Sequence, residues 1–166
     1  MVTDPKWLRV ARTKLGTKEA AGSANSATIL GWAKRPTRVL GMVYNADSVP
    51  WCGVFVAHCL QEDGIEPVSI AVRATSWSTW GLSLRPERLA PGAVLVFERP
   101  GGGHVGFYIG EDATAYHVLG GNQGDAVTIA RIAKDRCIAR RWPAGRPVIG
   151  RPVQMAARKP ISTDEA

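Results

Sequence analysis

The sequence predicts an α+β fold in which helices come first and an antiparallel β-sheet follows. Residues 48–64 carry apolar side chains at helical spacing, whereas the chain beyond residue 92 consists of short β-rich runs separated by glycine-containing turns. Helices and strands grouped in this way are typical of the α+β class. A chain of 166 residues is long enough for one domain. We place that domain at residues 1–145 and expect a basic, flexible tail over residues 146–166.

Two shorter helices are expected before the main one. The first covers residues 6–15 and ends at Gly16, and the second covers residues 27–33. Residues 35–47 contain proline, glycine and asparagine, which favour a connecting loop.

The main helix has clear start and stop signals. Ser48 can cap its first turn, Pro50 suits that turn, and Gly64 can end the helix. Cys52 is therefore expected close to the N-terminus of this helix.

The second half of the chain is expected to form the sheet, after a short helical piece over residues 76–80. Five β-rich runs follow the turn at residues 91–92: AVLVFER, HVGFYIG, TAYHVLG, DAVTIARI and CIARRW. The tail beyond Gly145 has three prolines and few large apolar side chains. We expect residues 155–166 to be poorly ordered.

The charge of the chain is positive and unevenly distributed. The formal net charge is +7, with eight Lys/Arg against two acids in residues 1–46, four against nine in residues 47–130 and nine against one in residues 131–160. Basic segments favour an anionic partner. Nucleic acid and a bacterial cell wall rich in carboxylates are both open at this point, as is a surface that is merely well solvated.

The composition also bears on location and redox state. No apolar run reaches the roughly 20 residues of a membrane helix, and residues 1–16 lack the apolar stretch of a signal peptide. We expect a protein that is made in the cytoplasm and reaches an external target after release or by another delivery system. The odd number of cysteines, Cys52, Cys59 and Cys137, favours reduced thiols over a disulfide framework.

Cys52 is the candidate nucleophile. The dipole and free N–H groups of a helix N-terminus stabilise a thiolate and lower the pKa of the thiol. Its own backbone N–H can also stabilise a developing oxyanion. A buried structural cysteine is the alternative interpretation.

His104 is the candidate base, because it follows three glycines and opens a strand, where its imidazole can reach another element. His58 lies six residues after Cys52, about 600° of helical rotation away, and is expected to face elsewhere. His117 alternates with apolar residues inside a strand and is expected to pack or lie on the surface.

Asn122 is the candidate orienting residue. It lies in the turn GGNQGD after the next strand, where its side chain can accept the second ring N–H of a histidine. Asparagine is also an ordinary turn residue, and Gln123 and Asp125 are possible substitutes.

The order of these motifs resembles the phage-associated branch of the CHAP/NlpC cell-wall peptidases. The resemblance runs from Trp7 to Pro143, and Glu19, Gly22 and Trp32 match the leader of that family. Five strings carry it: VPWCGVFVAHCL, ATSWSTWG, APGAVLVF, GGHVGFYIG and VLGGNQGDAV. One departure is Gly53, where serine or alanine is commoner.

The resemblance implies a papain-like fold and a triad of Cys52, His104 and Asn122. Because a triad supplies nucleophile, base and oxyanion donor by itself, we expect no metal or other cofactor. It implies a peptidoglycan hydrolase that cuts either the N-acetylmuramoyl-L-alanine bond or a bond within the stem peptide, as in a phage endolysin. We accordingly expect bacterial peptidoglycan as the partner, no nucleic acid, and a monomer. An antibacterial amidase toxin injected into rival cells uses the same fold and stays an alternative.

Four residues are candidates for substrate contact. Trp51, Trp77 and Trp80 offer aromatic faces that suit sugars and peptides, although core packing is the commoner use of such side chains. Glu19 can bind an amine of the stem peptide or cap the helix that follows it.

Two other function classes compete with an enzyme. A zinc protein would draw its ligands from Cys52, His58, Cys59, His104 and Cys137. However, Cys52 and Cys59 would lie about 10 Å apart along a helix, too far for one metal ion. A non-catalytic module that binds the cell wall would fit the basic flanks, but it would leave the Cys-His-Asn set without a use.

Overall fold

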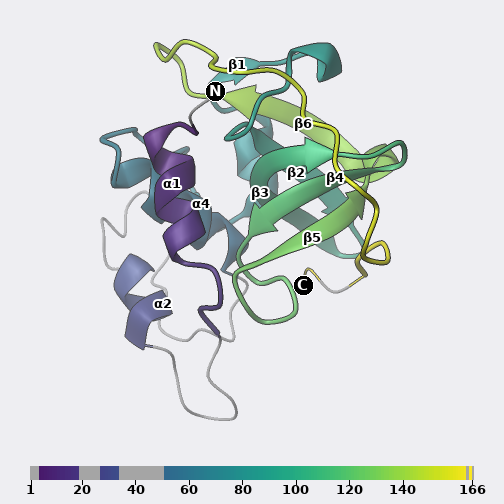
Figure 1. Ribbon diagram of the computed structural model, residues 1–166. Coiled ribbons are helices and arrows are strands. Elements are labelled where there is room, and N and C mark those ends of the chain that lie inside the picture. The colour runs from purple at the N-terminus through teal and green to yellow at the C-terminus, as the bar shows by residue number, and fades with distance from the viewer. Residues whose placement is uncertain (1–3, 19–26, 34–50, 164, 166) are drawn as a thin grey trace.

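The computed structural model describes residues 4–18, 27–33, 51–163 and 165, and it has an α+β architecture. Among these residues, three helices come first, α1 (Lys6–Thr13), α2 (Ala27–Ala33) and α4 (Cys52–Gln61), and a six-stranded antiparallel sheet follows (Figure 1). This confirms the predicted class and the predicted order of helices and strands.

The sheet has the order β1-β6-β2-β3-β4-β5, so that β5 lies at one edge and β3 near the centre. Its strands are β1 (Leu82–Ser83), β2 (Val94–Arg99), β3 (Gly102–Glu111), β4 (Ala115–Gly120), β5 (Thr128–Ala133) and β6 (Cys137–Trp142). The five predicted β-rich runs correspond to β2 to β6. The two-residue strand β1 was not predicted, because so short a segment has no alternation to detect.

Short 3₁₀ helices connect several of these elements. They are η1 (Ala74–Thr79), η2 (Pro86–Arg88) and η3 (Lys134–Arg136). The helical piece predicted over residues 76–80 is thus the 3₁₀ helix η1, which begins two residues earlier and ends one residue earlier than predicted.

The main helix ends as the sequence predicts. Gly64 has a φ of +69°, in the left-handed region, and its N–H and that of Ile65 bond to the carbonyls of Gln61 and Leu60 at 3.0 Å. Ser48, Pro50 and the loop predicted over residues 35–47 lie outside the described residues.

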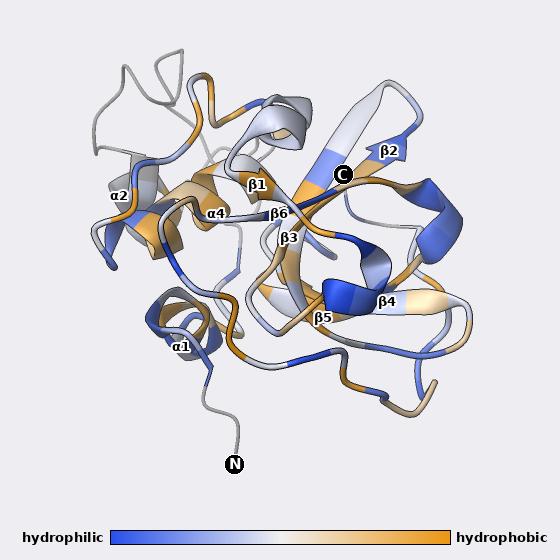
Figure 2. Cartoon of the chain, turned by 90° about the horizontal axis from the view of Figure 1, so that it is seen from above, coloured by the Kyte–Doolittle hydropathy of each residue, from blue (hydrophilic) through white to orange (hydrophobic). Residues whose placement is uncertain are grey.

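Helix α4 is the centre of the core. Every residue from Cys52 to Leu60 except His58 is buried, because α1 and α2 contact the helix as well as β3 and β4. Figure 2 shows α4 largely in the orange of apolar residues. A helix that is covered on several sides needs apolar residues around most of its circumference.

The segment after residue 145, where a flexible tail was expected, runs along the sheet and forms backbone hydrogen bonds with it. The N–H of Glu111 bonds to the carbonyl of Val153, and the N–H of Met155 bonds to the carbonyl of Glu111, both at 2.8 Å. The N–H of Ser162 bonds to the carbonyl of Arg131 in β5 at 2.7 Å. These backbone bonds hold the segment, drawn in yellow in Figure 1, despite its few large apolar residues.

Gly53 is required by packing rather than by backbone conformation. A Cβ at this position would lie 1.9 Å from the carbonyl oxygen of Ala71. The close approach of α4 to the segment that follows it therefore explains why glycine occupies the position after the cysteine, where serine or alanine is commoner.

We predict that Gly53→Ala destabilises the protein by about 1–3 kcal/mol, because an extra methyl group must displace backbone. Gly31→Ala is the matched control, since Gly31 in α2 has open space at its Cβ position and alanine favours a helix by about 1 kcal/mol. Urea unfolding of the two variants measures both effects. Equal stabilities would contradict the close approach at Gly53.

Candidate active site

Cys52 begins α4 and faces the central strand β3. Its side chain is only 3% exposed. Burial raises the pKa of the Cys52 thiol, and the backbone N–H groups of Val105 and Gly53 and the charge of Arg99 offset part of that rise. The helix start was expected to lower this pKa, but desolvation is the larger effect here. The thiol is therefore neutral in the resting protein.

His104 lies in β3 directly before Val105, whose N–H faces the thiol. It pairs with Phe97 of β2, and the two rings are 6.4 Å apart. The imidazole is fully buried, which lowers the pKa of His104 to about 4. At neutral pH it is consequently an uncharged ring that can accept a proton.

The amide of Gln123 fixes which ring nitrogen of His104 carries the proton. The Gln123 Nε2 donates to the carbonyls of Val118 and Thr128 at 3.2 and 2.8 Å, so its Oε1 is the atom that faces the ring. That Oε1 lies 2.9 Å from the His104 Nε2. An amide oxygen can only accept, so Nε2 is the protonated nitrogen and Nδ1 carries the lone pair.

The His104 Nδ1 is buried and has no hydrogen-bond partner among the described residues. A buried imidazole nitrogen without a partner costs free energy, and a catalytic role is one explanation for such an atom in a folded protein. The next residue in the strand, Val105, directs its backbone N–H toward Cys52, so the unpartnered nitrogen belongs to the strand segment beside the thiol.

The residue that holds the ring is Gln123 rather than the predicted Asn122. Both are buried, but Asn122 has a φ of +61°, which makes it a residue of the turn. The chain reverses there, and the next side chain, that of Gln123, lies against the imidazole. The sequence placed the turn correctly, but no feature of GGNQGD indicates which of its polar side chains faces the ring.

Two glycines make room for this arrangement. A Cβ at Gly120 would lie 2.7 Å from the Gln123 Oε1, and one at Gly103 would lie 2.8 Å from a methyl carbon of Thr75 and 3.0 Å from the carbonyl of Phe97. The glycines in the motifs around His104 and Gln123 therefore allow close packing at the site.

The residues predicted to contact substrate have different surroundings in the structure. Trp51 and Trp77 are fully buried in the core, where the Trp77 Nε1 donates to the carbonyl of Ala71 at 3.0 Å. Neither has an exposed face to offer a substrate, and core packing is their observed use. Trp80 is partly exposed and lines a pocket of about 290 Å³ beside Arg146. Glu19 lies outside the described residues.

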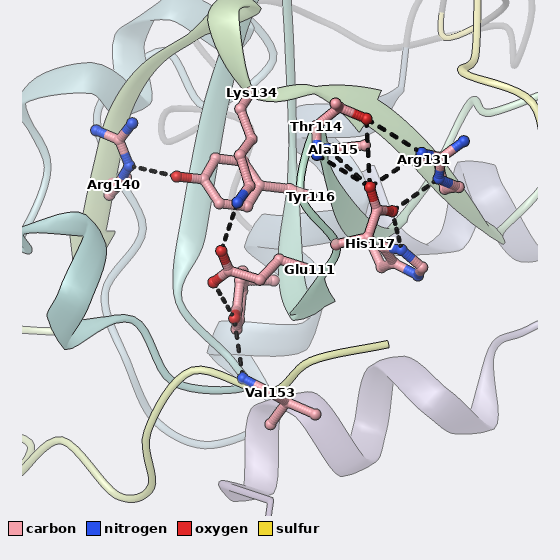
Figure 3. A network of polar contacts seen from close by, with 11 residues as sticks. Glu111, Thr114, Ala115, Tyr116, His117, Arg131, Lys134, Arg140 and Val153 are labelled. Carbon is pink, nitrogen blue, oxygen red and sulfur yellow. Dashed lines mark hydrogen bonds and ion pairs between the residues drawn. The ribbon is translucent and has the colours of Figure 1, made fainter. Parts of the chain in front are cut away.

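The other two histidines have different surroundings. The His58 ring stacks on Trp32 with 5.4 Å between centroids. The His117 Nε2 lies 2.7 Å from Asp112, which also receives two hydrogen bonds from Arg131, and Figure 3 shows this network on β4 and β5. Arg131 also holds the pKa of Asp112 below its usual range. His117 thus belongs to a network of polar contacts with Asp112 and Arg131.

Within the described ranges, no three His, Cys, Asp or Glu side chains are grouped so that they could hold a metal ion. The described helices also include none with the length and apolar character needed to cross a bilayer. Comparison with protein-family models and with curated proteins found no match.

We predict that iodoacetamide alkylates Cys52 slowly at neutral pH, with a rate that still rises above pH ~8.5, the ordinary cysteine value. Only the thiolate reacts, and a raised pKa moves its formation to higher pH. His104→Ala should leave this profile nearly unchanged, because the ring is already neutral. Mass spectrometry of the Cys52 peptide gives the rate, and a plateau reaching down to about pH 5 would instead indicate a resting thiolate–imidazolium pair.

Proposed function

We propose that this chain is a cysteine-dependent peptidoglycan hydrolase that cleaves an amide bond of the cell-wall peptide. The observation that carries the proposal is the neutral His104, held by Gln123 at one nitrogen and unpartnered at the other, in the strand that faces Cys52. Nucleophile, base and orienting group are the components of this chemistry. The resemblance to the CHAP/NlpC peptidases, with its ordered motifs, supports peptidoglycan as the substrate.

The reaction begins as the Cys52 Sγ attacks the carbonyl carbon of the amide. The thiol proton passes to the His104 Nδ1 while the C–S bond forms and the carbonyl electrons move to oxygen. Backbone N–H groups at the start of α4 stabilise the oxyanion. The imidazolium then gives its proton to the leaving nitrogen as the C–N bond breaks.

Water completes the cycle. It attacks the thioester while His104 takes one of its protons, and the C–S bond breaks as that proton returns to sulfur. The products are a carboxylic acid and an amine, so water is the only co-reactant. Because both groups start neutral, proton transfer accompanies attack.

The finer assignment of the fold also belongs to this proposal. A helix that presents a cysteine at its first residue, packed on an antiparallel sheet that presents the histidine, is the arrangement of the papain-like class. We propose that the chain has this fold and acts as a monomer without a bound cofactor. The basic flanks would attract it to an anionic envelope.

Both bonds named above suit this site, and so do both settings, phage lysis and an injected toxin. Mass spectrometry of muropeptides from digested sacculi identifies the bond. A new N-terminal L-alanine on the released peptide indicates an amidase, whereas cleavage within the stem indicates an endopeptidase.

Cys52→Ala and His104→Ala should each lower turnover on purified sacculi by on the order of 10³-fold or more, because the two residues act as one unit. Cys59→Ala and His117→Ala are matched controls that remove the same side chains elsewhere, and both should keep turnover when the variants are folded. Release of soluble muropeptides measures the rate. An active Cys52→Ala variant, or an active His104→Ala with a dead but folded His117→Ala, would overturn the assignment.

Gln123→Ala should lower kcat roughly 10²-fold, near the low end for general acid–base catalysis, and leave KM nearly unchanged. The ring loses the acceptor that fixes its tautomer, but no contact with substrate is removed. Asn122→Gly is the control, because glycine tolerates the left-handed backbone of that position. Steady-state rates on a muropeptide compare the two. Greater damage from Asn122→Gly would restore Asn122 as the orienting residue.

A further inference from the structure

Arg99 projects from the same face of the sheet as His104. It is the last residue of β2 and pairs with Gly102, just as Phe97 pairs with His104. Side chains of directly paired residues, and of residues two apart along a strand, lie on one face. The Arg99 side chain therefore leaves the sheet on the same face as the His104 side chain, two residues closer to the β2–β3 turn.

The guanidinium of Arg99 is held beside this turn by one hydrogen bond. Its Nε donates to the carbonyl of Gly103 at 3.1 Å, next to His104 in the chain. Gly102 has no side chain to fill the space opposite, and the nearest atom to its Cβ position is an Arg99 terminal nitrogen at 4.0 Å. This hydrogen bond orients the guanidinium and leaves both of its terminal nitrogens able to donate to other acceptors.

Arg99 forms no ion pair with an acid in the described part of the chain. Most of the buried or half-buried acids there are already paired with other basic side chains. It is half-buried, so its charge is less screened than that of a fully exposed side chain. This charge lowers the pKa values of both Cys52 and His104. An anion at the terminal nitrogens would therefore lie close to the reacting groups.

We propose that the Arg99 guanidinium forms a carboxylate-binding subsite beside Cys52. The planar fork of arginine binds a carboxylate through two parallel hydrogen bonds. The ligand class is a peptide carboxylate close to the bond that is cut. This deepens the proposed function and rests on it for the identity of the substrate, since cell-wall peptides carry free carboxylates.

The subsite is tested first without any cell-wall substrate. Iodoacetate and iodoacetamide alkylate the same thiolate and differ in the negative charge of the reagent, so the ratio of their rates cancels the thiolate fraction. We expect Arg99→Gln to lower the iodoacetate/iodoacetamide ratio at Cys52 by about 3- to 10-fold at low salt. Mass spectrometry of the Cys52 peptide separates this reaction from those at the other cysteines.

Arg88→Gln, in the exposed turn η2, removes the same charge and should leave the ratio unchanged. A ratio that is equal in the wild type and Arg99→Gln would overturn the subsite. So would an equal fall in both variants, because net charge alone would then explain the effect.

A second measurement identifies the ligand. Muropeptides with free stem carboxylates should be cleaved with a lower KM than their amidated counterparts, and Arg99→Gln should bring the two KM values together. A preference that survives in Arg99→Gln would overturn the role in substrate binding. If no muropeptide is cleaved by any variant, the proposed function fails, and the reagent ratio alone decides whether the anion subsite exists.

Discussion

The approach of the first turn of α4 to the segments around it is the constraint on which the site depends. Gly53 passes so close to the Ala71 carbonyl that a methyl group has no room, and this places the preceding residue, Cys52, against the N–H of Val105. The helix carries Cys52 and the sheet carries His104, so the relative position of the two residues is set by core packing. Rigid elements on both sides keep the two groups positioned without a substrate.

The second constraint is a chain of hydrogen bonds that runs through the Gln123 amide. Two carbonyls orient its nitrogen, its oxygen then accepts from His104, and the remaining ring nitrogen is left with its lone pair. Burial keeps both the thiol and the imidazole neutral in the resting state. A buried thiol with a raised pKa carries little thiolate at neutral pH, and the thiolate is the form that oxidants and electrophiles attack.

Much of this could be predicted from the sequence because it depends on local patterns. The α+β order, the end of α4 at Gly64 and the different surroundings of His104 and His117 follow from periodicity, glycine positions and strand alternation. The contact between Gln123 and the ring could not be predicted, since Asn122 and Gln123 are neighbours in one turn and the carbonyls that hold the Gln123 amide belong to Val118 and Thr128. The burial of Trp51 and the order of residues 153–162 depend on partners distant in sequence, such as Trp32 and Glu111.

The C-terminal segment has a consequence for the colloidal behaviour of the protein. β5 is the last strand of the sheet, and an open strand edge of this kind invites pairing with a second molecule. Residues 159–162 cover part of that edge through the backbone and side chain of Arg131. Because a single short segment does this, shortened forms of the chain are expected to self-associate through β5 although they retain Cys52 and His104. The C-terminal segment thus covers part of an edge that could otherwise pair with a second molecule.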